Sequence, residues 1–353
     1  MLPSGVFFRD FAAEAAYLRT GPQRLAMALF VLALVLLPAL AGAYLVGVIT
    51  LMFVTMIAVL GLQITVGMAG MINIGQSAFV GVGAFVSASL ASKLGWPFWL
   101  TLPAAALAAG VSSLLFGLPA LRIKGFYLAL TTVAAQIIFP IGIARLPTAW
   151  FGGSSGLAVE PVSIFGHALL KQHELYYFNL AFVLLFTLLA FNLKRTRVGR
   201  ALIAVRDNDI AASVLGVNIG YYKLIAFFVG AMFAGVAGAL LGYVVSYVTT
   251  DHFTLWLSIW YISMLIVGGM GSPLGAIFGT VVITALQESL HALGNAAAAR
   301  FGSDFGAFIF PATNSVLGVL IIAILVFQPH GLLTGWNTLK AAYRIWPYRH
   351  HGG

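Results

Sequence analysis

Long apolar runs separated by short polar segments dominate the chain from Leu25 onward. A helix that crosses a bilayer needs about 20 consecutive, mainly apolar residues. The pattern predicts ten such spans, and the third, eighth and ninth are short or interrupted by glycine. They cover residues 25–44, 46–66, 75–92, 98–120, 125–144, 175–193, 223–248, 255–269, 273–289 and 306–327. We therefore expect an all-α polytopic membrane protein with about ten transmembrane helices.

Composition supports this fold class. The chain is 61% hydrophobic and only 8% charged, whereas soluble domains are about 45–50% apolar and about 25% charged. Too few charged residues are present to cover a water-facing surface. Much of the exterior must therefore contact the lipid bilayer. The net charge of +9 lies in short loops between apolar runs, which fits the positive-inside rule and does not call for a nucleic-acid partner.

The basic residues predict an orientation. With both termini in the cytosol, the inside segments hold fourteen of the 18 Lys and Arg residues and the outside segments hold four. Such a bias favours an even number of crossings. The chain then divides into a cytosolic N-terminal tail (1–24), a transmembrane domain (25–333) and a cytosolic C-terminal tail (334–353).

Apolar residues recur at helical spacing in the N-terminal tail, which is either a short helix on the membrane surface or a loosely ordered segment. They are Phe7, Phe8, Phe11, Ala15 and Leu18.

Two polar segments are longer than a simple connection requires. The outer loop, 146–174, contains a glycine-rich run and two prolines, which predict a structured loop with turns. The inner loop, 194–222, has the highest charge density in the chain. Asp207 or Asn208 can begin a helix there and Gly216 can end it, which predicts one short amphipathic helix near 208–215, preceded by a basic turn. This helix either docks a soluble partner or lies on the lipid or on the chain's own cytosolic ends.

The inner loop resembles that of a known transporter family. The pattern Ala211-Ala212-x-x-x-Gly216 after Asp209 resembles the coupling loop of ABC importer permeases. The surrounding string, from Thr196 to Phe227, looks like the branched-chain amino-acid (Liv-type) permease family. In that family the loop inserts a short helix into a cleft on the ATPase subunit.

Glycine-rich segments interrupt two of the spans, at 67–85 and 268–279. Helix-breaking backbone at membrane depth is tolerated where it is buried in protein or lines a cavity, and paired breaks indicate a solute path. Close helix packing is the alternative role for these glycines. Asn73 and Gln76 lie within the first break, and buried amides either find partners or line a wet path.

The same segments resemble the Liv-type signature, with one departure. The run from Gly70 to Ala84 is similar to the family pattern, in which His usually stands at the position of Gln76, so solute specificity can differ. Further matches include Tyr127 with Thr131, the run Gly152-Gly153-x-x-Gly156 and the glycines of 268–275.

The resemblance implies a permease subunit of an ATP-binding-cassette importer in the bacterial inner membrane. Its partners would be a second homologous permease, two cytosolic ATPase subunits and a periplasmic solute-binding protein. The candidate site residues fall into three groups. For ATPase coupling they are Arg200, Arg206, Asp207, Asp209, Ala211, Ala212 and Gly216; for the solute path Asn73, Gln76, Tyr127 and Thr131; for contact with the binding protein Gly152, Gly153, Ser154 and Gly156.

This sequence lacks the residues that several other functions require. There is no phosphate-binding G-x-x-x-x-G-K-[ST] loop, so ATP would be hydrolysed by partner subunits. We expect no cofactor, metal site or enzymatic activity on this chain. The nine acidic residues fall in loops or near helix ends, which disfavours an ion-coupled carrier. A urea or amide permease of the same family, an ion-coupled secondary transporter and a passive channel remain the alternatives to a branched-chain amino-acid permease.

Overall fold

The computed structural model describes residues 21–119, 125–164, 167–301, 315–316, 318–319, 321–324, 326–328 and 331–345. This part of the chain is mainly helical, and seven of its helices are long and apolar enough to cross a membrane. The all-α polytopic fold is thereby confirmed. The count of ten spans and the cytosolic position of both termini stay predictions, and the surface helix predicted in residues 1–24 lies outside the described residues.

Six of the seven long helices coincide with predicted spans to within a few residues, whereas the seventh, α13 (Pro273–Phe301), continues twelve residues beyond the predicted end at 289. The other six are α3 (Ala43–Leu62, continued by the π-helix η1, Gln63–Met68), α4 (Gln76–Leu94), α5 (Phe98–Gly117), α6 (Phe126–Arg145), α8 (Gln172–Arg195) and α11 (Ile219–Val245).

Three further helices are shorter or less apolar. They are α2 (Gly21–Leu40), α12 (Leu255–Gly268) and α15 (Leu332–Ile345). The 14 residues of α12 fall short of the roughly 20 that a full span needs. The predicted C-terminal tail contains most of α15, and the tenth predicted span is described only in short helical pieces.

The helix ends follow from local chemistry. Gly95 closes α4 in the left-handed conformation at φ +62°, which glycine adopts without steric cost. Pro97 then precedes α5. The side chains of Asn218 and Thr254 accept backbone N–H groups in the first turns of α11 and α12, which satisfies donors that have no partner inside the helix.

Helix α11 forms the centre of the molecule and packs against α3, α4 and α5. Glycine permits the closest contacts. A β-carbon on Gly83 would collide with the backbone of Gly235, and one on Gly238 would collide with the carbonyl of Val80. The packing role predicted for glycines of the first break is thus confirmed for Gly83, and Gly235 and Gly238 of α11 act in the same way, because only hydrogen side chains let the backbones approach so closely. Gly81 packs against a side chain instead of a backbone, because a β-carbon there would collide with the ring of Phe139.

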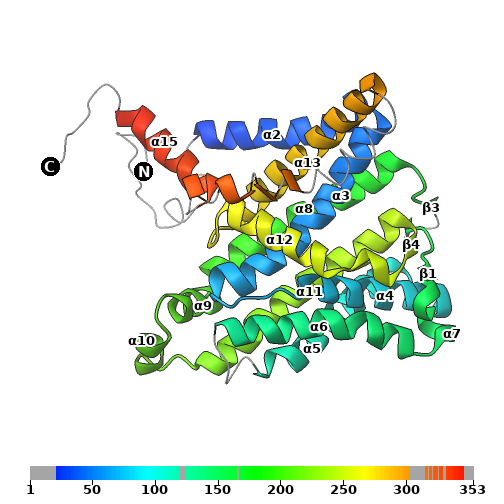
Figure 1. Cartoon of the computed structure of the whole chain (residues 1–353), viewed down its shortest axis with the longest axis horizontal. Helices are drawn as coiled ribbons and strands as arrows, with labels where there is room; N and C mark the ends of the chain where they lie inside the picture. Colours follow the sequence, from blue (N-terminus) through cyan, green and yellow to red (C-terminus); the bar gives the residue numbers. More distant parts are fainter. Residues whose placement is uncertain are drawn as a thin grey trace.

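Short strands gather at one end of the molecule. Strand β1 (Leu157–Ala158) pairs antiparallel with β4 (Tyr247–Val248), and β2 (Ser163–Ile164) pairs with β3 (His167–Ala168). Helices α9 (Arg197–Asp207) and α10 (Asp209–Val214) lie at the opposite end, at the left of the view (Figure 1). The inner and outer loops therefore lie at opposite ends of the helices, as the predicted topology requires.

Candidate functional site

The inner loop folds as two consecutive helices. The side chain of Thr196 accepts a hydrogen bond from the backbone N–H of Gly199 (3.2 Å) and caps α9. The prediction of a basic turn before the short helix is therefore wrong, because the residues from Arg197 to Asp207 are helical. Their apolar members Leu202 and Val205 are buried, so burial of one face stabilises a helix whose many charges had indicated a turn.

The predicted short helix is confirmed as α10. Asn208 stands in an extended conformation between the two helices, and its Oδ1 accepts the N–H of Ala211 at 3.0 Å. Asp209 in the first turn places a negative charge at the positive end of the helix. Gly216 follows the helix at φ +84°, a conformation that favours glycine.

One face of α10 is apolar and uncovered. Ala212 is buried, whereas Ile210 is 72% exposed and both Val214 and Leu215 are 82% exposed. We call these three exposed residues the α10 face. Large apolar side chains gathered on a charged, water-facing segment mark an interaction site. Their position at the end opposite β1 and β4 (Figure 1) places that site on the side predicted to be cytosolic.

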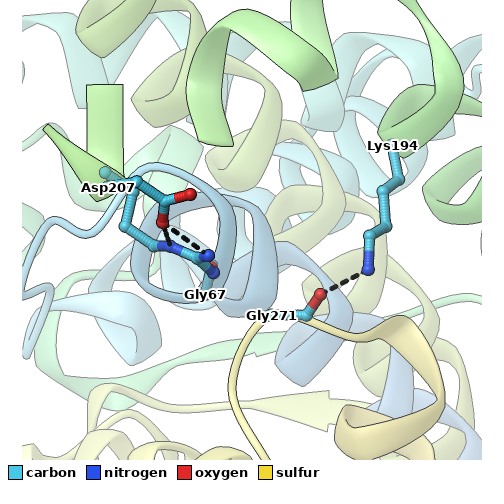
Figure 2. Close-up of polar contacts among 5 residues, drawn as sticks. Gly67, Lys194, Asp207 and Gly271 are labelled. Atoms are coloured by element: carbon cyan, nitrogen blue, oxygen red, sulfur yellow. Dashed lines mark hydrogen bonds and ion pairs between the residues drawn. The ribbon is translucent and has the colours of Figure 1, made fainter. Parts of the chain in front are cut away.

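Behind the α10 face, α9 ends against the first glycine-rich break. The Nη1 of Arg206 donates to the carbonyl oxygen of Gly67 at 2.7 Å. Its Nε and Nη2 both donate to Oδ1 of Asp207, at 2.9 and 2.8 Å. Figure 2 labels Asp207 and Gly67, the two residues that this guanidinium bonds. Because Gly67 belongs to the last turn of η1, its carbonyl is at the negative end of a helix, where a cation is favourable.

A second cation reaches the other break. The Nζ of Lys194, at the end of α8, donates to the carbonyl oxygen of Gly271 at 2.6 Å (Figure 2). The buried amide of Gln63 also meets this turn: its oxygen, in the orientation that satisfies both groups, accepts the N–H of Gly271 (2.6 Å) and of Ser272 (2.7 Å). We call this set of residues the junction: Gln63, Gly67, Lys194, Arg206, Asp207 and Gly271.

Six of the seven predicted coupling residues belong to the junction or to α10 and its end, and the seventh, Arg200, lies on α9. Arg206 and Asp207 belong to the junction. Asp209, Ala211, Ala212 and Gly216 belong to α10 or its end, and Arg200 is exposed on α9. Lys194 and Gln63 were not predicted. Lys194 could have been predicted, because it is a cation near the end of a helix. No residue near Gln63 in the sequence indicates that its amide would bond a turn some 200 residues further along the chain.

Asn73 and Gln76 form a buried amide pair that braces the first break. The Nδ2 of Asn73 donates to Oε1 of Gln76 at 3.0 Å, and Nε2 of Gln76 donates to the carbonyl of Ala58 at 3.0 Å. Oδ1 of Asn73 accepts the N–H of Gly75. Both side chains are 1% exposed or less, so in this conformation their polar atoms bond to protein.

The other two solute-path residues lie elsewhere. Tyr127 is 70% exposed and Thr131 donates to its carbonyl, so both lie on the outward side of α6. The buried side of α6 carries Thr132, whose Oγ1 accepts the N–H of Ile74 (3.0 Å), and Gln136. The structure thus does not bring the four predicted residues together.

Gln136 extends the buried network to α12. Its Oε1 accepts hydrogen bonds from Ser77 (3.0 Å) and Ser258 (3.3 Å), and its Nε2 donates to the carbonyl of Phe253 at 2.5 Å. Sequence reasoning missed Gln136, Ser77 and Ser258. An amide inside an apolar span was a visible signal for Gln136.

The glycine-rich outer loop is structured, as predicted. Helix α7 (Thr148–Phe151) and the 3-10 turn η3 (Gly153–Ser155) precede β1. Gly152 and Gly156 have φ of +66° and +81°, and a β-carbon on Gly156 would lie 2.5 Å from the carbonyl oxygen of Val248 in β4. The hydroxyl of Tyr247 donates to the Ser155 carbonyl. Three of the predicted contact residues, Gly152, Gly153 and Gly156, thus shape one compact feature at the end opposite α10, and the backbone of Ser154 belongs to it.

Among the described residues no three His, Cys, Asp or Glu side chains lie together in a way that could hold a metal ion.

Comparison with known proteins points to one family. The family described as "Branched-chain amino acid transport system / permease component" matches residues 44–327. The chain is 29% identical over 339 residues to the "High-affinity branched-chain amino acid transport system permease protein LivM" of Escherichia coli K12, covering 86% of this chain and 74% of that protein. It is 26% identical over 297 residues to the "Probable branched-chain amino acid transport permease protein LivH" of Methanocaldococcus jannaschii, covering 80% and 89%. No solved structure matches the chain.

Proposed function

This chain belongs to the branched-chain amino-acid transport permease family, and we propose that it is the membrane-spanning subunit of an ATP-driven importer. It would carry branched-chain or similar small amino acids across the bacterial inner membrane. Its partners would be a second homologous permease, two cytosolic ATPase subunits and a periplasmic solute-binding protein. The relatives are named as permeases and not as enzymes, and hydrolysis of ATP would take place on the ATPase subunits.

The exposed α10 face carries this proposal. A six-residue helix is too short to be stable alone, yet here Asn208 caps it and Gly216 ends it. Its apolar side chains Val214 and Leu215 are almost fully exposed. A passive channel has no use for such a helix, whereas a permease driven by a soluble ATPase requires a docking element of this kind.

The acidic residues argue against an ion-coupled carrier. Such carriers use carboxylates buried within the membrane. Glu288 lies within the long helix α13, but its Oε2 accepts a hydrogen bond from Tyr44 at 2.6 Å. Tyr44 is the second residue of α3, which places Glu288 at the level of a helix end. Among the described residues, this supports an energy source outside the membrane.

The solute is proposed from the names of the relatives. Urea and other amides are the alternative, because amide permeases resemble the same family, and Gln76 stands where that family usually has His. Binding of leucine, isoleucine, valine, urea and acetamide to the cognate binding protein, measured by calorimetry, separates the two classes. Tight binding of urea without binding of leucine would overturn the amino-acid assignment.

Copurification tests the proposed docking role directly. The tagged chain, coexpressed with the ATPase subunits of its own genome, should retain them through purification in mild detergent. Leu215→Asp places a charge on the α10 face, where it would be desolvated by the partner, and should abolish retention. Leu170→Asp is the matched control, because Leu170 is 73% exposed in the outer loop. Retention of the ATPase by Leu215→Asp at the wild-type level would reject docking at α10.

A further inference from the structure

Two cations flank α9 and bond different parts of the transmembrane domain: Lys194 lies at the end of α8 and Arg206 near the end of α9. Lys194 bonds the carbonyl of Gly271 in the turn between α12 and α13. Arg206 bonds the carbonyl of Gly67 at the end of η1. We propose that Arg206 and Lys194 are positioning residues that transmit movement of α9 and α10 to the two glycine-rich breaks, and so couple the docking helix to the solute path. This inference rests on the proposed function.

The hydrogen bonds of Arg206 to Asp207 fix the orientation of its guanidinium group. Asp207 accepts Nε and Nη2 of Arg206 with a single oxygen, Oδ1. That pairing fixes the plane of the guanidinium and leaves Nη1 aimed at Gly67. The Arg206–Asp207 pair is partly exposed, with side chains 34% and 61% accessible, so as an ion pair it adds little stability. Its effect is to orient a charge-assisted hydrogen bond, which is stronger than a neutral one.

The two breaks are also bonded to each other. The amide oxygen of Gln63 accepts the N–H groups of Gly271 and Ser272, while Lys194 holds the carbonyl of the same Gly271. The backbone of Gly271 is thereby held on both its polar sides. A displacement of Gly67 at the end of η1 must therefore reach the turn before α13 as well.

The two segments that the cations bond, the end of η1 and the turn between α12 and α13, have backbone that can change conformation. Gln63 and Gly67 belong to a π-helix, a form that often marks functional sites within α-helices. Gly70 and Gly271 have φ of +69° and +91°. Large backbone changes in moving proteins are absorbed by a few residues at element ends. The two cations thus act where the helices can bend.

The loop side of the connection is short. Arg206 and Asp207 end α9, and Asn208 begins the cap of α10 by accepting the N–H of Ala211 and, through its carbonyl, that of Ala212 at 3.0 Å. Only Asp207 and Asn208 separate Arg206 from the first residue of α10, so a force on the α10 face reaches the guanidinium through a short stretch of capped backbone.

Substitution by methionine removes each charge but keeps the stem. Arg206→Met and Lys194→Met should be compared with Arg197→Met, since Arg197 is exposed at the first residue of α9. The assembled transporter, with its ATPase subunits and binding protein, is reconstituted in proteoliposomes, and ATP hydrolysis and leucine uptake are measured together. Copurified ATPase and the melting temperature of each complex are measured in parallel.

For Arg206→Met and Lys194→Met we expect normal retention of the ATPase, continued hydrolysis and lower uptake. The ATP consumed per leucine should rise about tenfold or more, since about tenfold is the lower end of the factor that corresponds to losing one hydrogen bond to a charged group. Arg206→Lys keeps a donor for the Gly67 carbonyl and should recover part of the uptake. Arg197→Met should match the wild type in every measurement.

Two results would overturn the inference. The first is wild-type uptake and ATP consumption in both junction variants. The second is a parallel fall of uptake and hydrolysis, with an unchanged ratio, together with lost ATPase or a lower melting temperature, which would make the two residues merely structural. Failure of the proposed function is recognised separately, because the wild-type complex itself would then show no ATP-dependent uptake.

Discussion

Gly70 and Arg206 touch across the junction: a β-carbon on Gly70 would lie 2.6 Å from Cγ of Arg206. Gly70 also has φ +69°. The backbone of the first break therefore lies directly on the aliphatic stem of Arg206, in the last turn of α9. This contact joins the inner loop to the membrane segment that the sequence marks as broken.

The first prediction concerns this contact. Gly70→Ala should reduce leucine uptake by the assembled transporter, because the alanine is strained at positive φ by about 1–2 kcal/mol and displaces Arg206. Gly142→Ala in α6 is the control, since a β-carbon there meets nothing within 4 Å. Equal uptake by the two variants would show that the Gly70 contact has no role in transport.

The second prediction concerns the buried amide pair. Gln76→Leu leaves the Ala58 carbonyl and the Asn73 amide without their partner, and an unsatisfied buried polar group costs about 1–3 kcal/mol. The melting temperature in detergent should fall relative to the wild type. Gln287→Leu on the half-buried side of α13 should change it less. A Gln76→Leu protein as stable as the wild type would contradict the bracing role.

The third prediction concerns the outer loop. Gly156→Ala should disturb the pairing of β1 with β4, because its β-carbon would press on the Val248 carbonyl at an unfavourable φ. Uptake that depends on the binding protein should fall, while the ATPase subunits are retained. Ser155→Ala keeps the carbonyl that Tyr247 contacts and serves as the control. Uptake by Gly156→Ala at the wild-type level would show that this loop has no role in receiving solute from the binding protein.

The fourth prediction concerns sidedness. The chain has no cysteine, so single cysteines report position without further changes. In spheroplasts, an impermeant maleimide should label Trp150→Cys in α7, and should label Val214→Cys in α10 only after the membrane is opened. Labelling of Val214→Cys in sealed spheroplasts would place α10 outside and reverse the predicted topology.

The sequence predicted most of the helices because the bilayer imposes one simple requirement, a long apolar run. It also predicted α10, since Asn208 and Gly216 are strong helix-end signals. It failed for α9, where charges at positions such as Arg200 and Arg206 hid a buried face formed by Leu202 and Val205. Helical periodicity was present there but was outweighed by charge density.

The contents of the junction could not be predicted in the same way. The glycine-rich breaks were visible, but their partners come from remote segments. Arg206 and Gly67 are 139 residues apart, and Lys194 and Gly271 are 77 apart. Such pairs depend on how whole helices pack around α11. For the same reason Tyr127 and Thr131 were assigned to the solute path, although Thr132 and Gln136 are the residues of α6 that face the break.

The most direct test of the account is uptake by proteoliposomes that contain the chain, its partner permease and its ATPase subunits, with the binding protein on the side of β1 and β4. Leucine should accumulate only when ATP is supplied on the side of α10, and an inactive ATPase should abolish accumulation. Leucine uptake by the permease subunits alone, driven by a proton or sodium gradient and indifferent to ATP, would contradict it.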